Sequence, residues 1–184
     1  MKKRNDSHND NKNNNKTHKS ALEVGAAYLA SRMRTVAEVE KHLAGKDYAQ
    51  AEIQEAVDEL VAHKYLDDYA YAVRYYEYSM EKRRGSRRAM RELEEKGVDR
   101  NTIRNAYEDF VYENGVDEYQ EALAVAEKEL YVIPDTFGGD YSEELVMKPV
   151  DDKLLAKIGR KLESRGFKND DIYRVLSEIR SRAR

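Results

Sequence analysis

The sequence predicts an all-α protein of three tandem three-helix repeats, which form an elongated, curved array behind a disordered N-terminal tail. Proline occurs only at Pro134 and Pro149, so most of the chain lacks the residue that interrupts helices. Ala, Glu, Lys, Arg and Leu, which favour helices, dominate the composition. An apolar spacing typical of helices also recurs in three copies along the chain.

Residues 1–20 consist largely of Asn, Lys, Asp, His and Ser, with six basic and two acidic residues. A segment with so few apolar side chains cannot bury enough surface to offset the entropy lost on ordering. We therefore expect a disordered basic tail. His8 and His18 lie in this tail without paired metal ligands at helical spacing, and we interpret both as solvated.

The repeat is anchored on Leu43, Leu93 and Leu162. Apolar residues follow each anchor after five, ten, fourteen and seventeen positions. In chain order they are Tyr48, Ile53, Val57, Leu60, Val98, Ile103, Tyr107, Phe110, Phe167, Ile172, Leu176 and Ile179. From the isoleucine onward, this spacing is that of a helix that buries one face.

Turn and cap residues delimit these helices. Gly97 and Gly166 stand where a helix can end in the left-handed conformation, and Asp47 takes that place in the first copy. Thr35 and Glu38 have the spacing of a capping box, in which each side chain binds the other residue's backbone amide. The other predicted N-caps are Asp67 or Asp68, Ser86, Asp99 and Asp151.

The chain therefore divides into units at 21–67, 68–115 and 116–184. The predicted helices cover about 21–32, 36–45, 50–64, 68–84, 86–96, 100–114, 117–131, 152–165 and 170–182. The second and third anchors are 69 residues apart, against 50 for the first pair, and the surplus predicts a loop inserted at about 132–150. Units this small cannot each sustain an independent core, so neighbours must pack together into an extended binding surface.

No recognisable catalytic constellation is present. The chain has no cysteine and no phosphate-binding or zinc-protease motif. His42 and His63 lack an acidic partner at helical spacing, so we interpret them as surface residues. Asp67-Asp68 and Asp151-Asp152 are better explained as helix caps than as metal ligands. We expect a protein that is not an enzyme and binds no cofactor or metal.

Location follows from what the sequence lacks. No apolar run approaches the roughly 18 residues that a membrane span requires. The charged N-terminus has no apolar stretch typical of a signal peptide. We therefore expect a cytoplasmic protein without a membrane anchor.

Acidic and basic residues are concentrated in separate segments of the chain, although the net charge is only −3. Residues 113–152 hold twelve acidic and two basic residues, whereas residues 153–184 hold ten basic and four acidic ones. The densest basic segment, here called the basic cluster, comprises Lys82, Arg83, Arg84, Arg87, Arg88 and Arg91. It fits either a solvated face or a binding site. Arg87 and Arg88 fall in a first helical turn, where cations are disfavoured, and this favours a phosphate or carboxylate partner.

Five tyrosines lie on the predicted helix 68–84. Helical spacing places Tyr69 and Tyr76 on one stripe with Ala72, Val73 and Met80, and we expect this stripe in the core. Tyr71, Tyr75 and Tyr78 form an adjacent stripe. We expect it to pack against a neighbouring unit, and stacking on nucleic-acid bases is the alternative.

Three segments together resemble the RecX family. Residues 66–72 look like its L-D-D-x-x-F-A motif, with Tyr71 in place of phenylalanine. Residues 85–97 are similar to G-P-x-R-I-x-x-E-L-x-x-K-G, although Ser86 replaces the proline and Ala89 a larger aliphatic residue. Residues 27–39 are similar to the opening A-x-x-x-L-x-x-R-x-R-T-x-x-E-L. The likeness covers about 21–184, but not the tail or the insert.

The resemblance implies a regulator of the recombinase RecA, with a role in DNA repair and the SOS response. Such a protein lodges in the groove of the recombinase–DNA filament, limits its extension and promotes its disassembly. Strand exchange and ATP hydrolysis are thereby damped, without a cofactor or catalytic residues. We expect a monomer that contacts DNA within the filament and binds DNA weakly alone.

A binding site for this role would be basic. We expect the basic cluster to face DNA phosphates or an acidic recombinase surface, together with the basic residues of the C-terminal helices. These are Arg160, Lys161, Arg174, Arg180, Arg182 and Arg184. Two other functions fit the same sequence: a DNA-binding protein with helix-turn-helix-like pairs, and a helical-repeat scaffold for a protein partner.

Overall fold

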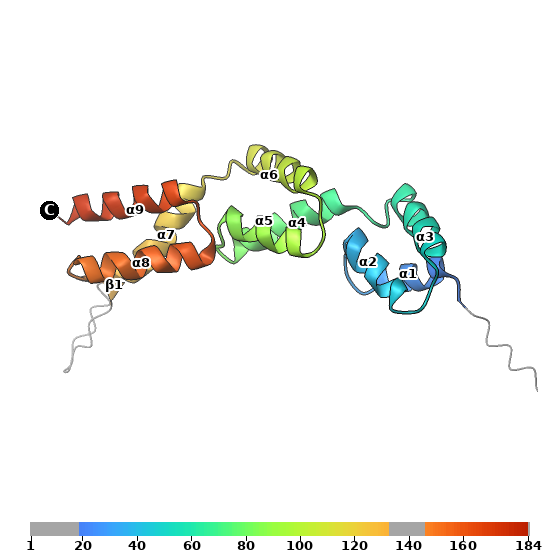
Figure 1. Cartoon of the computed structure of the whole chain (residues 1–184). Coiled ribbons are helices and arrows are strands. Elements are labelled where there is room, and N and C mark those ends of the chain that lie inside the picture. The colour runs from blue at the N-terminus through green and yellow to red at the C-terminus, as the bar shows by residue number, and fades with distance from the viewer. Residues whose placement is uncertain (1–18, 133–145, 184) are drawn as a thin grey trace, which may run out of the picture.

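The computed structural model describes residues 19–132 and 146–183, which contain nine helices and two short strands. The elements are α1 (Ala21–Leu29), α2 (Val36–Ala44), α3 (Gln50–Ala62), α4 (Asp68–Glu81), α5 (Ser86–Glu95), α6 (Arg100–Asn114), α7 (Glu118–Leu130), β1 (Tyr131–Val132), β2 (Val146–Met147), α8 (Asp152–Arg165) and α9 (Asn169–Arg182). The helices form an elongated row with α1–α3 at one end and α7–α9 at the other (Figure 1). The predicted all-helical array is confirmed.

Three sets of three helices make up the row: α1–α3, α4–α6 and α7–α9, here called units 1, 2 and 3. Each set has its own hydrophobic core. In each set the first and third helices pack against each other, and every extensive helix–helix contact in the described chain stays within one set. Neighbouring units therefore meet over small surfaces, and the fold extends in one direction.

The anchor leucines sit at the centre of the three cores. Leu43, Leu93 and Leu162 are all fully buried. The positions that follow them are buried or half-buried in each copy, so the repeated apolar pattern marks the core as predicted. Leu66, between α3 and α4, closes the core of unit 1.

Most predicted caps are confirmed, and one is wrong. Thr35 and Glu38 form the capping box of α2, and the side chains of Asp67, Asp99 and Asp151 accept amide hydrogen bonds at the starts of α4, α6 and α8. Ser86 is not a cap, because Gly85 occupies that position and the Ser86 hydroxyl donates to Glu118 instead. The predicted left-handed helix ends are also confirmed, with φ values of 65° for Asp47, 82° for Gly97 and 83° for Gly166.

Two predictions for the tyrosines of α4 are wrong. Tyr76 is buried as expected and its hydroxyl donates to the Ile103 carbonyl, but Tyr69 is exposed. Tyr71 is buried in the core of unit 2, and the Tyr75 hydroxyl donates to Glu92 on α5. These two rings thus pack inside their own unit and not against a neighbour, because α4 inserts a broader face between α5 and α6 than one helical stripe.

The segment predicted as an inserted loop lies largely outside the described residues, as does the predicted tail apart from Lys19 and Ser20. The described edges of the insert pair as a short antiparallel ladder, with Tyr131 opposite Met147 and Val132 opposite Val146. This ladder was not predicted, since its strands are only two residues long. It brings the two ends of the insert together at the end of α7.

Candidate interaction surface

Two equivalent junctions connect the units. At the first, the Val36 amide at the start of α2 donates to the Asp68 carboxylate at the start of α4, at 2.9 Å. At the second, the Ser86 amide at the start of α5 donates to the Glu118 carboxylate at the start of α7, also at 2.9 Å. Each carboxylate therefore accepts a hydrogen bond from an amide that has no partner within its own helix. It also lies at the positive end of the dipole of that helix, which belongs to the preceding unit.

A glycine-containing turn completes each junction. The helix-ending Gly97 of unit 2 faces Ala37, and Gly166 of unit 3 faces Arg88. A Cβ atom on either glycine would lie 2.3 Å from the Cβ of the facing residue. These glycines are therefore required twice, for the left-handed conformation that ends the helix and for the close approach of two units.

Backbone hydrogen bonds lock the second junction further. The Gly85 amide donates to the Arg165 carbonyl at 2.9 Å, and the Arg87 amide donates to the Gly166 carbonyl at 3.1 Å. The Arg165 guanidinium donates in return to the carbonyls of Lys82 and Arg83, both at 3.0 Å. The backbone of the basic cluster thus lies in the joint between units 2 and 3.

Half of the basic cluster has acidic partners within the chain. Arg83 pairs with Glu121 at 3.5 Å, whereas Arg84 and Arg88 share Glu92 at 3.4 and 2.8 Å. Although partial burial opposes it, hydrogen bonds from Tyr75 and Arg88 lower the pKa of Glu92. Of the two cations in the first turn of α5, Arg88 thus has a carboxylate partner, Glu92, within the chain itself.

The other half of the cluster has no acidic partner among the described residues. The Lys82 ammonium lies 5.7 Å from the centre of the Tyr78 ring. The Arg87 guanidinium donates to the neutral side chain of Asn169 at 2.6 Å, and Arg91 is exposed. These three cations are available to an external anion.

Most of the predicted C-terminal site residues are paired as well. Arg160 is exposed and has no ion-pair partner in the described ranges, and Arg184 lies outside them. The pairs are Lys161 with Glu129, Arg174 with Asp171, Arg180 with Asp152, and Arg182 with both Glu127 and Glu178. Hydrogen bonds from Lys157 and Lys161 lower the pKa of Glu129 to about 2. Acidic and basic residues that belong to separate segments of the sequence therefore lie next to each other in unit 3.

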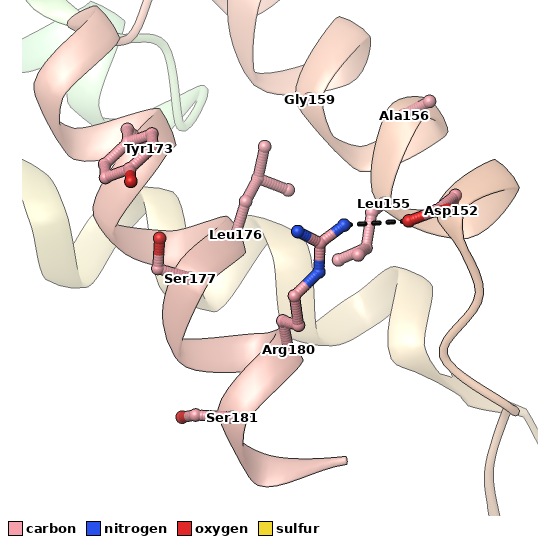
Figure 2. A pocket seen from close by; sticks show the side chains of 9 residues that line it. All are labelled: Asp152, Leu155, Ala156, Gly159, Tyr173, Leu176, Ser177, Arg180 and Ser181. Atoms are coloured by element: carbon pink, nitrogen blue, oxygen red, sulfur yellow. Dashed lines mark hydrogen bonds and ion pairs between the residues drawn. The ribbon is translucent and has the colours of Figure 1, made fainter. Parts of the chain in front are cut away.

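One open groove lies on unit 3, between α8 and α9, with a volume of about 460 Å³. Figure 2 shows Leu155 and Leu176 on its sides and the Arg180 side chain reaching across to Asp152, at 2.8 Å. Leu155 precedes its anchor leucine by seven residues, as Val36 and Ser86 precede theirs. One end of the groove therefore corresponds to the helix starts at which units 1 and 2 contact the next unit. Here, however, α8 begins three residues earlier and the Leu155 amide is bound to the Asp151 carbonyl. This amide is therefore not available to the carboxylate of a further unit.

Other kinds of site find little support in the described chain. Residues 19–132 and 146–183 contain no group of three or more His, Asp or Glu side chains able to hold a metal ion. His42 stacks on Tyr28 with 3.9 Å between ring centres, and His63 is exposed. No helix in these ranges is long and apolar enough to cross a membrane.

Comparison with known proteins agrees with this architecture. Residues 21–60 match the model of the first three-helix domain of RecX. Over 158 residues the chain is 32% identical to the regulatory protein RecX of Vibrio parahaemolyticus, covering 86% of this chain and 90% of that protein. The chain belongs to the RecX family. Regulatory protein RecX of Bacillus subtilis is 36% identical over 102 residues, which are 55% of this chain but only 38% of that longer RecX.

Solved RecX structures share the fold. The crystal structure of RecX from Lactobacillus salivarius superposes with a TM-score of 0.66 at 23% identity, covering 86% of this chain and 93% of that one. A second RecX crystal structure gives a TM-score of 0.64 at 21% identity and covers 86% of this chain and 70% of the other. This chain thus shares its fold with two RecX proteins of known structure.

One candidate residue was missed by the sequence reasoning. Lys41 stands two positions before the anchor Leu43, where Arg91 and Arg160 stand before Leu93 and Leu162. Alignment of the three units of this RecX-family chain on their anchors finds it at once. Charge density along the sequence does not reveal Lys41, because it is a single cation among neighbours of mixed charge.

Proposed function

We propose that this RecX-family chain binds the filament that the recombinase RecA forms on DNA, and that it damps the strand exchange and ATP hydrolysis of that filament. The observation that supports this most strongly is the row of three units locked by two equivalent junctions. Such a row offers a long surface that can follow a polymer over several of its subunits. The proposed regulator acts in the cytoplasm, where the filament assembles, and itself catalyses no reaction.

The arrangement of α5 favours a filament partner over a sequence-specific DNA-binding function. A helix-turn-helix protein places the start of its recognition helix in the major groove. The start of α5 is instead covered by the turn between α8 and α9, through the Arg87–Gly166 hydrogen bond, and by the start of α7, through the Ser86–Glu118 contact. This helix start cannot enter the major groove of duplex DNA without opening the junction.

The proposed function is tested with purified RecA on single-stranded DNA. Addition of the protein is expected to reduce ATP hydrolysis and strand exchange at less than one molecule per RecA protomer, because each elongated array is proposed to bind along several protomers. An unrelated DNA-dependent ATPase on the same DNA serves as the control, because mere sequestration of DNA would inhibit both enzymes. Undiminished RecA activity at stoichiometric amounts would contradict the proposal.

We also propose that the protein acts as a monomer, because both ends of the row lack the groups that form junctions. Unit 1 has Ala21 at the helix start where Asp68 and Glu118 stand, and Asp47 where Gly97 and Gly166 stand. Sedimentation equilibrium is expected to give the monomer mass of 21.4 kDa at micromolar concentrations. A mass that rises with concentration toward a dimer or a longer chain would show that units of different molecules dock.

A further inference from the structure

Three positions carry a basic residue in all three units when the units are aligned on their anchor leucines. The first lies nine residues before the anchor, the second two residues before it, and the third three residues after it. The nine residues, in that order, are Arg34, Arg84 and Lys153; Lys41, Arg91 and Arg160; and Lys46, Lys96 and Arg165. Any of the three positions could therefore present a cation at regular intervals along the row.

The first of these positions serves mainly internal contacts. The Arg34 guanidinium lies 4.1 Å from the centre of the Tyr28 ring, and its Nε atom is buried. Arg84 pairs with Glu92 at 3.4 Å. Two of the three cations at this position are thus held within their own units.

The third position belongs to the junctions. Lys96 pairs with Glu38 of unit 1 at 3.5 Å, and Arg165 donates to two carbonyls of unit 2. Lys46 alone has no preceding unit to contact. This position therefore holds the row together and does not offer a repeated external site.

The second position differs from both. Lys41, Arg91 and Arg160 are exposed in all three units. None of them has an ion pair or a hydrogen bond to another side chain among residues 19–132 and 146–183. Of the three repeated positions, this is the one whose cation is exposed and without an ion-pair partner in every unit of the described chain.

The three cations recur at the same place within each unit. They lie on α2, α5 and α8, the second helix of each unit, which occupy the lower side of Figure 1 with α6 and α9 above them. Both junctions have an amide–carboxylate hydrogen bond and a close glycine approach, so the step from unit 1 to unit 2 resembles the step from unit 2 to unit 3. A cation is therefore presented once per unit with a repeated geometry.

We propose that this basic row, formed by Lys41, Arg91 and Arg160, binds the phosphate backbone of a DNA strand that runs along the array. A nucleic-acid backbone is a line of regularly spaced anions and suits single cations repeated at regular intervals. The inference rests on the proposed function. It narrows the expected DNA contact to Arg91 of the basic cluster and Arg160 of the C-terminal set, and it adds Lys41 of unit 1.

The test compares two triple variants with the same change in charge. The row variant carries Lys41→Gln, Arg91→Gln and Arg160→Gln. The control variant carries Lys64→Gln, Arg104→Gln and Lys128→Gln, which remove one exposed cation from each unit at positions outside the row. None of these control residues has an ion-pair partner in the described chain. Circular dichroism spectra of both variants are expected to match that of the unaltered protein.

Binding to a labelled oligothymidylate is then measured over a range of salt concentrations. Each phosphate contact with a single strand contributes about 0.7 to the slope of log affinity against log salt, so the row variant is expected to lose about 2 from this slope. Its affinity at 0.1 M salt is expected to fall about a hundredfold by the same relation, whereas the control variant keeps the slope of the unaltered protein.

Three results would overturn the basic row as a DNA-binding surface: equal slopes for both variants, an unaltered protein that fails to bind the oligonucleotide in 20 mM salt, or a row variant that binds DNA normally but no longer inhibits RecA. The last result would assign the row to the recombinase protein. RecA inhibition by the unaltered protein is measured separately, so its absence would contradict the proposed function without affecting the DNA result.

Discussion

Replacement of Gly85 by alanine is expected to lower the free energy of unfolding by about 3 kcal/mol, the upper end of the usual cost of overpacking. The φ angle of Gly85 is −73°, so alanine introduces no backbone strain there. Its Cβ atom would nevertheless lie 2.3 Å from both the Gly166 carbonyl oxygen and the Phe167 nitrogen. Both atoms belong to the backbone, so no side-chain rotation can relieve the clash, and the junction between units 2 and 3 must open.

Gly45 provides the matched control for this change. Its φ angle of −69° is equally ordinary, and a Cβ atom there would be 3.4 Å from the nearest atom, the Lys41 carbonyl oxygen. Gly45→Ala is expected to change stability by less than about 1 kcal/mol. Urea unfolding followed by circular dichroism measures both variants. An unchanged midpoint for Gly85→Ala would mean that units 2 and 3 are not docked in solution.

Removal of the Glu118 carboxylate is expected to have an effect of similar size. This side chain accepts hydrogen bonds from the Ser86 amide at 2.9 Å, the Ser86 hydroxyl at 2.7 Å and the Tyr107 hydroxyl at 3.0 Å. It also pairs with Lys168 at 3.5 Å. Glu118→Ala leaves these part-buried groups without their acceptor, and a loss of about 2–3 kcal/mol is expected. Chemical denaturation measures this loss.

Two further variants separate the junction from a general effect of charge. Glu113→Ala removes an exposed carboxylate of α6 that has no hydrogen-bond or ion-pair partner among the described residues, and it is expected to change stability by less than about 0.5 kcal/mol. Glu118→Gln keeps one acceptor oxygen, and its loss of stability is expected to lie between those of Glu118→Ala and Glu113→Ala. Equal stabilities for the Glu118→Ala and Glu113→Ala variants would show that the carboxylate does not hold the units together.

The candidate surface was less predictable than the fold. The sequence located the basic cluster, but Arg83, Arg84 and Arg88 are held by Glu121 and Glu92. Charge density along a chain does not reveal which cations have partners, because exposed ion pairs form wherever folding brings opposite charges together. The basic row differs in this respect: its members have no ion-pair partner among the described residues, and they are recognised as a set only once the repeat is aligned.

The sequence by itself determined the three units. Burial of Leu43, Leu93 and Leu162, the helix ends at Asp47, Gly97 and Gly166, and most of the caps follow from apolar spacing and turn chemistry within a few residues. Such local patterns are legible because a helix relates residues three and four positions apart.

Only the tertiary structure decided how the units join and which cations remain free. The Thr35 hydroxyl binds the Lys96 carbonyl across 61 positions, and Ser86 binds Glu118 across 32. No local periodicity connects residues so far apart, so the pairing depends on the way two finished units pack. That packing places the backbone of residues 82–88 in a joint and leaves Lys41, Arg91 and Arg160 exposed on the second helix of each unit.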